Sequence, residues 1–226
     1  MKVKILRQMS PDASPYWEVF DYDGPEDNSV AGVLDHLNYN DDMVNAAGEK
    51  STRISWECSC LQGVCGACAM VICGRPALAC ETFLKDLKGV ELTIRPLQKF
   101  PVIRDLTVDR SSIQENLRAT NVFIGEYRPA SAEDQAHQYA AAKCLKCGLC
   151  LEVCPNYGSG KSFFGAAFAN DCYLVAARSR DRAGQIRAAY AEHFGNACSK
   201  SLSCVEVCPV KIPTLASIAK MNRKKL

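Results

Sequence analysis

Fourteen of the 226 residues are cysteine, and the spacing of the first group points to iron chemistry. Cys60, Cys65, Cys68 and Cys80 are arranged as C-x4-C-x2-C followed by a more distant cysteine. This is the spacing of plant-type [2Fe–2S] sites. Zinc sites usually offer two C-x2-C-like pairs, and this segment has one. We therefore expect these four thiolates to hold a [2Fe–2S] cluster, with a zinc site or unligated core thiols as the alternatives.

A second group of cysteines lies in the C-terminal half. Cys144, Cys147, Cys150 and Cys154, followed by proline, form the run C-x2-C-x2-C-x3-C-P. This is the bacterial ferredoxin run, whose fourth cysteine ligates the other of two clusters. A second run is therefore required, and the segment CSKSLSCVEVCP at 198–209 supplies it.

The second run departs from the template at one position, where Ser201 replaces the second cysteine. The cross-pairing predicts a [4Fe–4S] cluster held by Cys144, Cys147, Cys150 and Cys208. It leaves three thiolates for the other site, Cys154, Cys198 and Cys204. Because an alkoxide competes poorly with thiolates for iron, we favour a [3Fe–4S] cluster there. Ligation through the Ser201 hydroxyl and a labile cube remain the alternatives.

Three cysteines, Cys58, Cys73 and Cys172, fit none of these templates. Free cysteine commonly behaves as a small buried hydrophobe, and we expect that role for them. Cys172 is also a possible rescuing ligand for the site that lacks a fourth thiolate. The three histidines lie outside the motifs. We predict no catalytic acid, base or nucleophile on this chain.

Composition supports metal ligation over disulfides. The chain has 27 basic and 25 acidic side chains, a net charge of +2 that gives no electrostatic argument for a nucleic-acid partner. No apolar run approaches the ~20 residues of a membrane-spanning helix, and the N-terminus lacks the apolar core of a secretory signal. We expect a cytoplasmic protein unless a partner recruits it to a membrane, and a reducing cytoplasm disfavours disulfides.

The segments that would position the first cluster are predicted to form strands and one helix. Val3 and Ile5 alternate with polar residues, as do residues 16–20, and a turn-rich stretch separates them, which predicts a β-hairpin. Asn28 or Ser29 is placed to cap a short helix that continues to Leu37.

Further strands are predicted around the cysteine loop, at 69–72 and 90–94. Within the loop, Gly63 and Gly66 allow the backbone to turn tightly and bring its N–H groups towards the cluster. Two strands, a helix, a cysteine-bearing loop and more strands indicate a small α+β domain that ends near residue 104.

The C-terminal half is predicted to be helical. Ser131 followed by Asp134 suggests a capping box for a helix that runs towards Ala142. Apolar residues recur at helical spacing in three later segments, 163–178, 181–193 and 213–225.

Over essentially its full length, the pattern resembles the iron–sulfur subunit of the succinate dehydrogenase and fumarate reductase family. The resemblance is carried by the [2Fe–2S] loop, PALACETFLKD, FPVIRDLTVD, CLKCGLCLEVCPNYG, SRDR and CSKSLSCVEVCP. It implies an N-terminal β-grasp, plant-type ferredoxin domain over residues 1–104. It also implies an all-α, bacterial-ferredoxin-like domain over residues 105–226, which would carry the [4Fe–4S] and [3Fe–4S] clusters.

The resemblance also implies partners. A flavoprotein subunit with FAD would interconvert succinate and fumarate, and membrane anchor subunits would hold quinone. The [2Fe–2S] cluster would face the flavin and the [3Fe–4S] cluster the quinone. The chain would then be peripheral, held by its partners at the cytoplasmic side of the cell membrane, and would pass single electrons while the flavin performs the hydride chemistry.

Departures from the family pattern bear on the quinone. Ubiquinone-reactive relatives carry tryptophan shortly after the cysteine–proline step and histidine after the first cysteine of the last run. Here Tyr157, Gly158 and Ser199 occupy those places. The Pro-x-aromatic-Gly form resembles quinol:fumarate reductases that use menaquinone. Pro155 and Lys211 are the residues that the resemblance assigns to a quinone-facing surface, although Lys211 is offset by one position.

The sequence thus predicts an electron-transfer subunit of a succinate:quinone or quinol:fumarate oxidoreductase. One alternative is the same three-cluster chain serving a flavoenzyme with a soluble, non-quinone electron partner, such as a thiol pair. A second alternative, from another class, is a zinc-stabilised binding module.

Overall fold

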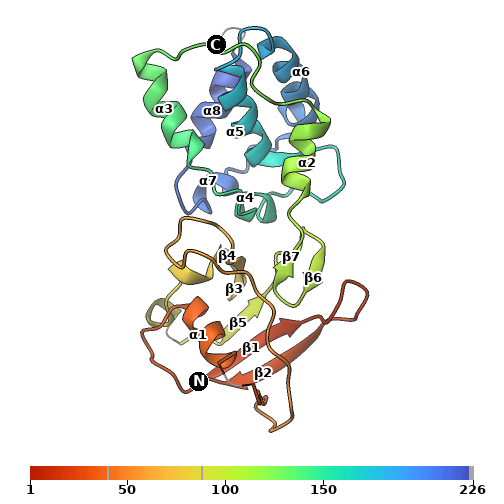
Figure 1. Ribbon diagram of the computed structural model, residues 1–226, viewed down its shortest axis with the longest axis vertical. Coiled ribbons are helices and arrows are strands. Elements are labelled where there is room, and N and C mark those ends of the chain that lie inside the picture. Colours follow the sequence, from red (N-terminus) through yellow and green to blue (C-terminus); the bar gives the residue numbers. More distant parts are fainter. Residues whose placement is uncertain (40, 88, 224–226) are drawn as a thin grey trace. The chain divides into compact units, whose positions relative to one another are not determined.

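The structure is a computed structural model that describes residues 1–39, 41–87 and 89–223. The chain divides into two compact units, Met1–Asp109 and Arg110–Leu226 (Figure 1). The first unit contains a β-sheet and one α-helix, and the second is helical. The protein is therefore of mixed α and β structure, with the sheet in its N-terminal part.

A five-stranded mixed sheet forms the core of the first unit. Its strands are β1 (Lys2–Arg7), β2 (Tyr16–Asp21), β3 (Ala69–Ile72), β4 (Arg75–Leu78) and β5 (Leu92–Arg95). Their order is β2-β1-β5-β3-β4. Strands β1 and β5 are parallel, and the other neighbouring pairs are antiparallel. The chain leaves the sheet after β2 and returns at β3, so the cysteine loop leads directly into a buried strand with neighbours on both sides.

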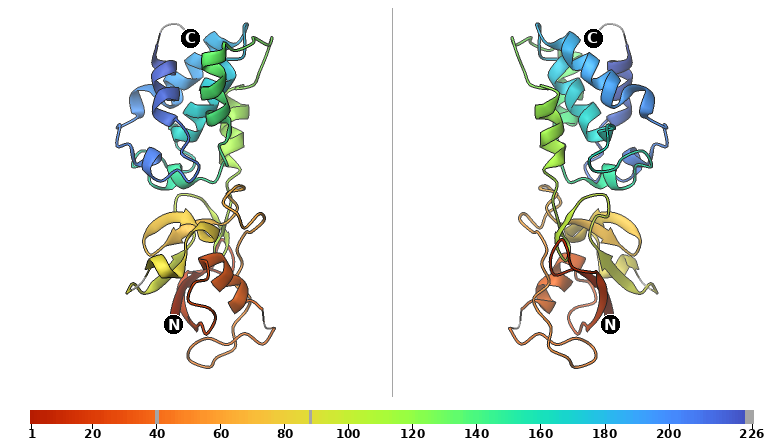
Figure 2. Two further views of the ribbon diagram at one scale, coloured as in Figure 1. Left: turned by 90° about the vertical axis from the view of Figure 1, so that its left-hand side faces the viewer. Right: turned by 90° about the vertical axis from the view of Figure 1, so that its right-hand side faces the viewer.

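The predicted hairpin and helix are confirmed. In the β1–β2 hairpin, Val3 is opposite Phe20, and both side chains are buried. Helix α1 (Val30–Leu37) begins after Ser29, whose Oγ accepts the N–H of Gly32 at 3.1 Å. Ser29, rather than Asn28, is therefore the N-cap. The helix lies against the sheet (Figures 1 and 2), where its buried residues complete the core.

Strand β3 coincides with the predicted 69–72, whereas β5 begins at Leu92, two residues later than predicted. Several short elements were not predicted from the sequence. They are β4, the 3₁₀ helices η1 (Ala79–Glu81) and η2 (Leu84–Leu87), and the small pair β6 (Val102–Arg104) and β7 (Thr107–Val108).

A buried arginine joins the end of this unit to its first strand. Arg7 is fully buried, and its guanidinium donates to both carboxylate oxygens of Asp105, at 3.0 and 3.2 Å, and to Glu18 at 2.6 Å. Asp105 also accepts the backbone N–H groups of Gln8 and Ser55. These bonds hold the β6–β7 turn against β1, which is why the compact unit continues beyond residue 104.

The second unit is a group of helices around a central one. They are α2 (Ser112–Ala119), α3 (Ala132–Ala142), α4 (Leu149–Glu152), α5 (Gly165–Ala176), α6 (Ala183–His193), α7 (Ser203–Glu206) and α8 (Thr214–Asn222), with the 3₁₀ helix η3 (Gly195–Ala197) before α7. Helix α5 lies among the others in Figure 1, contacts α2, α3, α4, α6 and α8, and is buried along most of its length. Its residue Ala166 lines both of the cysteine-lined cavities described below.

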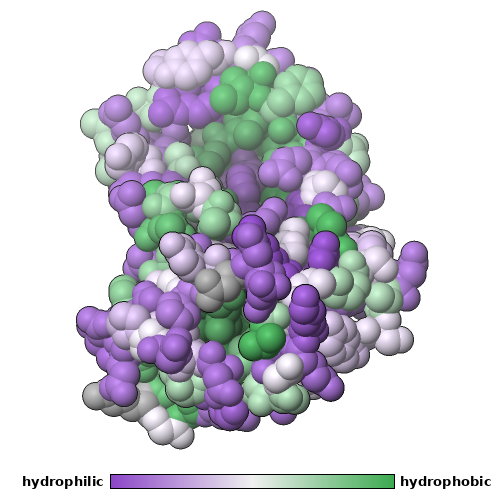
Figure 3. Space-filling model, turned by 60° about the horizontal axis from the view of Figure 1, so that its bottom comes forward, coloured by the Kyte–Doolittle hydropathy of each residue, from purple (hydrophilic) through white to green (hydrophobic). Residues whose placement is uncertain are grey.

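The predicted helices are found with shifted ends. Helix α3 ends at Ala142 as predicted, and its N-cap Ser131 accepts the N–H of Asp134. The last predicted helix ends at Asn222, and its predicted end at Lys225 lies outside the described residues. None of the helices in the described residues is both long and apolar enough to span a membrane. On the face drawn in Figure 3, hydrophobic residues form separate patches between hydrophilic ones.

Candidate cluster-binding sites

The first cysteine loop bends at glycines. Gly63 and Gly66 have φ values of +71° and +78°, a region that glycine adopts without steric cost. A Cβ atom at Gly63 would also lie 2.8 Å from the side chain of Glu81, so the loop could not keep this path with a larger residue. The turns fold the loop back over η1, which carries Cys80.

These bends direct backbone N–H groups at the thiols. Cys60 Sγ accepts from Gln62 and Val64 at 3.3 and 3.4 Å, and Cys80 Sγ accepts from Gly63 at 3.3 Å. The N–H of Gln62, the largest contribution, helps to lower the pKa of Cys60 to about 7. Donors of this kind stabilise negative charge on sulfur, which is what a cluster-bound thiolate requires.

The four predicted [2Fe–2S] ligands lie in this loop and in η1. The Sγ atoms of Cys68 and Cys80 are 3.4 Å apart and buried, and a side-chain hydrogen bond joins Cys60 to Cys65. Burial is the main reason that the pKa of Cys80 is raised to about 12. Two buried and two more accessible thiols, three of which accept backbone N–H groups, fit a small cluster under a loop.

The two later cysteine runs have the same backbone shape. Lys146 and Gly148 in the first run have positive φ values of 55° and 86°, and Lys200 and Leu202 in the second have 59° and 62°. A four-residue helix follows each, α4 in the first run and α7 in the second. The second run therefore keeps the template's fold although Ser201 replaces a cysteine.

The first of two cysteine-lined cavities collects the predicted [4Fe–4S] set. Its lining includes Cys144, Cys147, Cys150 and Cys208, together with Cys204. Burial raises the pKa of Cys147 to about 11, and it raises the pKa of Cys150 well above its ordinary value. Residues from both runs and from α5 close the cavity, so thiols more than fifty positions apart share one apolar space.

The second cavity collects the predicted [3Fe–4S] set. Cys154, Cys198 and Cys204 line it, and Ser201 lies on the same wall. Six apolar residues also line it, and so do two polar ones, Ser199 and Lys200; the apolar residues are Phe163, Ala166, Phe194, Leu202, Leu215 and Ile218. Three thiols in a space with this lining fit a cluster with three cysteine ligands.

Within the described part of the chain, no three cysteine, histidine or acidic side chains lie close enough together to hold one metal ion. A cluster spreads its cysteines over several irons. Its ligands therefore stand farther apart than those of a single ion, as the thiols lining these cavities do.

The three leftover cysteines differ in their surroundings. Cys172 is buried within α5, as predicted, and it lines neither cavity. Cys58 is exposed, because it lies on the irregular segment before the cysteine loop, so the prediction of a buried thiol is wrong there. Cys73 is half-buried in the β3–β4 turn, where its Sγ lies 3.4 Å from the carbonyl oxygen of Glu91.

The two residues that the resemblance assigned to quinone are exposed and lie outside the second cavity. Pro155 follows Cys154, and Lys211 follows the end of the second run. Lys211 Nζ donates to the carbonyl oxygen of Glu206 at 3.2 Å, at the end of α7. The structure therefore brings the eleven predicted cluster ligands into three groups but does not bring Pro155 and Lys211 into a cavity with them.

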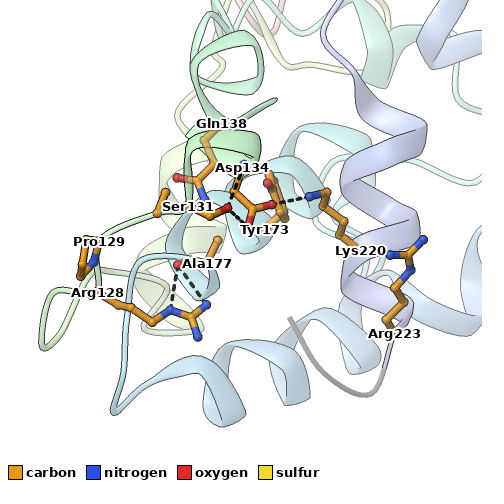
Figure 4. A pocket seen from close by; sticks show the side chains of 10 residues that line it. Arg128, Pro129, Ser131, Asp134, Gln138, Tyr173, Ala177, Lys220 and Arg223 are labelled. Carbon is orange, nitrogen blue, oxygen red and sulfur yellow. Dashed lines mark hydrogen bonds and ion pairs between the residues drawn. The ribbon is translucent and has the colours of Figure 1, made fainter. Parts of the chain in front are cut away.

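A further pocket of about 440 Å³ has no cysteine among its lining residues. Figure 4 shows three of its charged side chains engaged within the fold: Arg128 donates twice to the carbonyl oxygen of Ala177, and Lys220 pairs with Asp134. These contacts fasten the start of α3 to α8 and cap the end of α5. These charged side chains therefore serve to hold the helices together.

An ion pair that sequence reasoning missed lies beside the first cavity. Lys146, between two predicted ligands, pairs with Asp171 of α5. The unusual lysine within the first run was visible in the sequence, but its partner is 25 positions away in another element. No spacing rule connects the two.

Comparisons with known proteins agree with the cysteine geometry. A family described as "2Fe-2S iron-sulfur cluster binding domain" matches residues 2–115, and one described as "4Fe-4S dicluster domain" matches residues 140–212. The succinate dehydrogenase iron-sulfur subunit of Bacillus subtilis is 35% identical over 230 residues, which cover 97% of this chain and 90% of that protein. The fumarate reductase iron-sulfur subunit of Haemophilus influenzae is 30% identical, with 96% and 90% covered.

A solved structure has the same fold. A chain of the Mycobacterium smegmatis Sdh1 complex in the apo form superposes with a TM-score of 0.75 at 23% identity, over 97% of this chain and 92% of that one. The two-unit architecture is thus one that an experimental structure also contains.

Proposed function

The chain belongs to the family of succinate dehydrogenase and fumarate reductase iron–sulfur subunits, which are electron-transfer components of oxidoreductase complexes, and on that premise we propose that it links a flavoprotein to menaquinone through three clusters. The order would be [2Fe–2S], [4Fe–4S], [3Fe–4S]. FAD on the partner subunit would interconvert succinate and fumarate, and membrane anchor subunits would hold the quinone.

The proposed ligands are those that share a loop or a cavity. The [2Fe–2S] cluster is assigned to Cys60, Cys65, Cys68 and Cys80. The [4Fe–4S] cluster is assigned to Cys144, Cys147, Cys150 and Cys208, and the [3Fe–4S] cluster to Cys154, Cys198 and Cys204. The grouping of these thiols in the cluster loop and the two cavities supports the assignment.

The chain's own contribution is to space the clusters, to keep water away and to set their potentials. When bound, the clusters accept and release single electrons. The N–H groups at Cys60 and Cys80 favour added negative charge on the first cluster. The apolar linings around the other two limit solvent access, which also affects the potential.

We further propose that the two units are ferredoxin-like domains with a boundary near residue 104. The mixed sheet with α1 against it supports a β-grasp, plant-type ferredoxin domain. The paired cysteine runs with α4 and α7 support a bacterial-ferredoxin-like domain. Since Asp105 is bound to Arg7, this boundary would lie a few residues after 104, beyond the end of β7.

The quinone end is assigned to the [3Fe–4S] site. Exposed Pro155 and Lys211 flank the two runs that hold this site, and we propose them as quinone-facing residues. The chain would be peripheral at the cytoplasmic side of the membrane, held there by its partners. The observation that carries this proposal is the cavity in which Ser201 lies with the three thiols. Three thiolates without a fourth favour a [3Fe–4S] cluster, and the family resemblance assigns that cluster to the quinone side.

Turnover of the intact complex tests this function. The purified complex should reduce fumarate with a menaquinol analogue as the electron donor, and Cys154→Ala should abolish that activity while succinate still reduces the flavin. A complex that turns over with a soluble thiol donor, but not with any quinol, would contradict the quinone link. Ser199, at a place where ubiquinone-reactive relatives carry histidine, is the feature that favours this second candidate.

A further inference from the structure

Lys146 occupies an unusual position for a lysine. It lies between Cys144 and Cys147, lines the same cavity as they do and has a φ of 55°. L-residues seldom adopt this region, which favours glycine and asparagine. The backbone alone therefore gives no reason for lysine here, and the reason is to be sought in its side chain.

The Lys146 ammonium forms an ion pair with Asp171 on α5. The side chain of Lys146 is 30% exposed and that of Asp171 10%. The second carboxylate oxygen of Asp171 has no hydrogen-bond partner in the described residues. Such a partly buried, incompletely bonded pair is a poor way to stabilise a fold, because desolvation offsets the attraction between its charges.

The second cysteine run provides an internal comparison. Lys200 has the same place in the template and the same left-handed backbone, with a φ of 59°. It lines the second cavity, but it is exposed, and no ion pair to it is found among the described residues. The backbone shape of these runs thus does not require a buried partner for the lysine, and the Asp171 contact is specific to the first run.

We propose that Lys146 and Asp171 set the reduction potential of the [4Fe–4S] cluster with opposing charges, Lys146 raising it and Asp171 lowering it. This inference rests on the proposed ligand set of the first cavity. Reduction adds one electron to the cluster, and no bond in the protein forms or breaks. The added negative charge is stabilised by the nearby ammonium and destabilised by the carboxylate.

Both charges lie beside the proposed ligands. Lys146 lies between Cys144 and Cys147 in the sequence and lines the first cavity with them, and its ammonium pairs with Asp171 on α5. An electron added to a cluster in this cavity would therefore be attracted by the ammonium and repelled by the carboxylate.

Neutral variants of similar size test the proposal in the assembled complex. The midpoint potential of the [4Fe–4S] signal is measured by redox titration with electron paramagnetic resonance. Lys146→Gln should lower the potential and Asp171→Asn should raise it. Each shift should change the ratio of reduced to oxidised cluster at a fixed potential by about tenfold, or about 59 mV. The double variant should return close to the native value.

Two variants control for altered structure. Lys146→Arg keeps the charge and should leave the potential near the native value. Lys200→Gln, at the matching place in the second run, should leave the [4Fe–4S] potential unchanged. A pair with a purely structural role would give single variants that shift together or not at all, and that result with an intact signal would overturn the inference alone. Absence of a [4Fe–4S] signal from the native complex would overturn the ligand assignment as well.

Discussion

Ser201 is the residue that distinguishes the two cysteine runs chemically. The runs share their backbone shape, and the second cavity contains three thiols with Ser201 on its wall. Because the surrounding fold is retained, a thiol at this position would reach the same place as the native hydroxyl.

Replacing Ser201 with cysteine should therefore convert the proposed [3Fe–4S] cluster into a [4Fe–4S] cluster. The physical reason is that a fourth thiolate would hold the iron that the hydroxyl leaves unsupported. The measurement is low-temperature electron paramagnetic resonance of the oxidised protein, where the [3Fe–4S] signal should largely disappear in the variant.

Cys172→Ala is the matched control for this change, because Cys172 is buried in α5 but lines neither cavity. It should leave the [3Fe–4S] signal at native intensity. Loss of that signal in Cys172→Ala would mean that Cys172, and not the three proposed thiols alone, supports the cluster.

The grouping of the candidate cluster ligands could be predicted from the sequence wherever their spacing matches a known cluster motif. Cys144 and Cys208 are in different runs, yet the ferredoxin cross-pairing anticipated their shared cavity. The contact between Lys146 and Asp171 could not be predicted, since it depends on how α5 packs against the first run. The surroundings of Cys58 were also missed, because burial depends on tertiary packing rather than on residue type.

At the scale of elements, strong local signals gave correct predictions and weak ones did not. The hairpin, α1 and α3 have alternation or caps that lie within a few residues of sequence. Helix α2 was missed because Ile113 is its single buried residue, so it has little hydrophobic periodicity to detect. Strands β6 and β7 are only three and two residues long, too short for a pattern of alternation.

The ion pair between Asp134 and Lys220 is a contact between α3 and α8 that can be tested by pH (Figure 4). The hydrogen bond from Lys220, and then that from Ser131, hold the pKa of Asp134 below its usual value. A carboxyl group whose pKa is lower in the folded than in the unfolded protein stabilises the fold at any pH above its pKa in the unfolded protein. This stabilisation is lost as the pH falls through its pKa in the folded protein.

Asp134→Asn should thus lower the stability of the protein at pH 7 by about 0.5 kcal/mol, a small effect because both side chains are partly exposed. The difference from the native protein should be smaller at pH 3 than at pH 7, because the stabilisation declines once the pH falls below the ordinary carboxyl pKa of about 3.9. Thermal unfolding at the two pH values, followed by circular dichroism, measures it. An equal difference at both pH values would show that the ion pair is not its cause.

At the scale of the whole molecule, Arg7 joins segments that lie far apart in the sequence. It binds Asp105, 98 positions away, and Glu18 on the neighbouring strand. All three side chains are buried. The bonds among these three residues therefore fix the end of the first unit, where the chain continues to the helical unit.

Arg7→Met should destabilise the first unit by about 3–5 kcal/mol, because it removes the buried cation that Glu18 and Asp105 share and leaves Asp105 only the half-exposed Arg104, at 3.9 Å. Denaturant unfolding monitored by the absorbance of the [2Fe–2S] cluster measures the loss. Lys2→Gln is the matched control, since it removes the exposed Lys2–Asp21 pair and should cost less than about 1 kcal/mol. Similar losses in both variants would contradict the structural role given to Arg7.

We propose that this one chain carries three clusters of different types. Low-temperature electron paramagnetic resonance of the purified protein, with iron, acid-labile sulfide and zinc analysed in the same sample, tests it most directly. The oxidised protein should show a [3Fe–4S] signal, and reduction with dithionite should add [2Fe–2S] and [4Fe–4S] signals. A protein with two [4Fe–4S] clusters and no [3Fe–4S] signal, or one with zinc and no sulfide, would contradict the account.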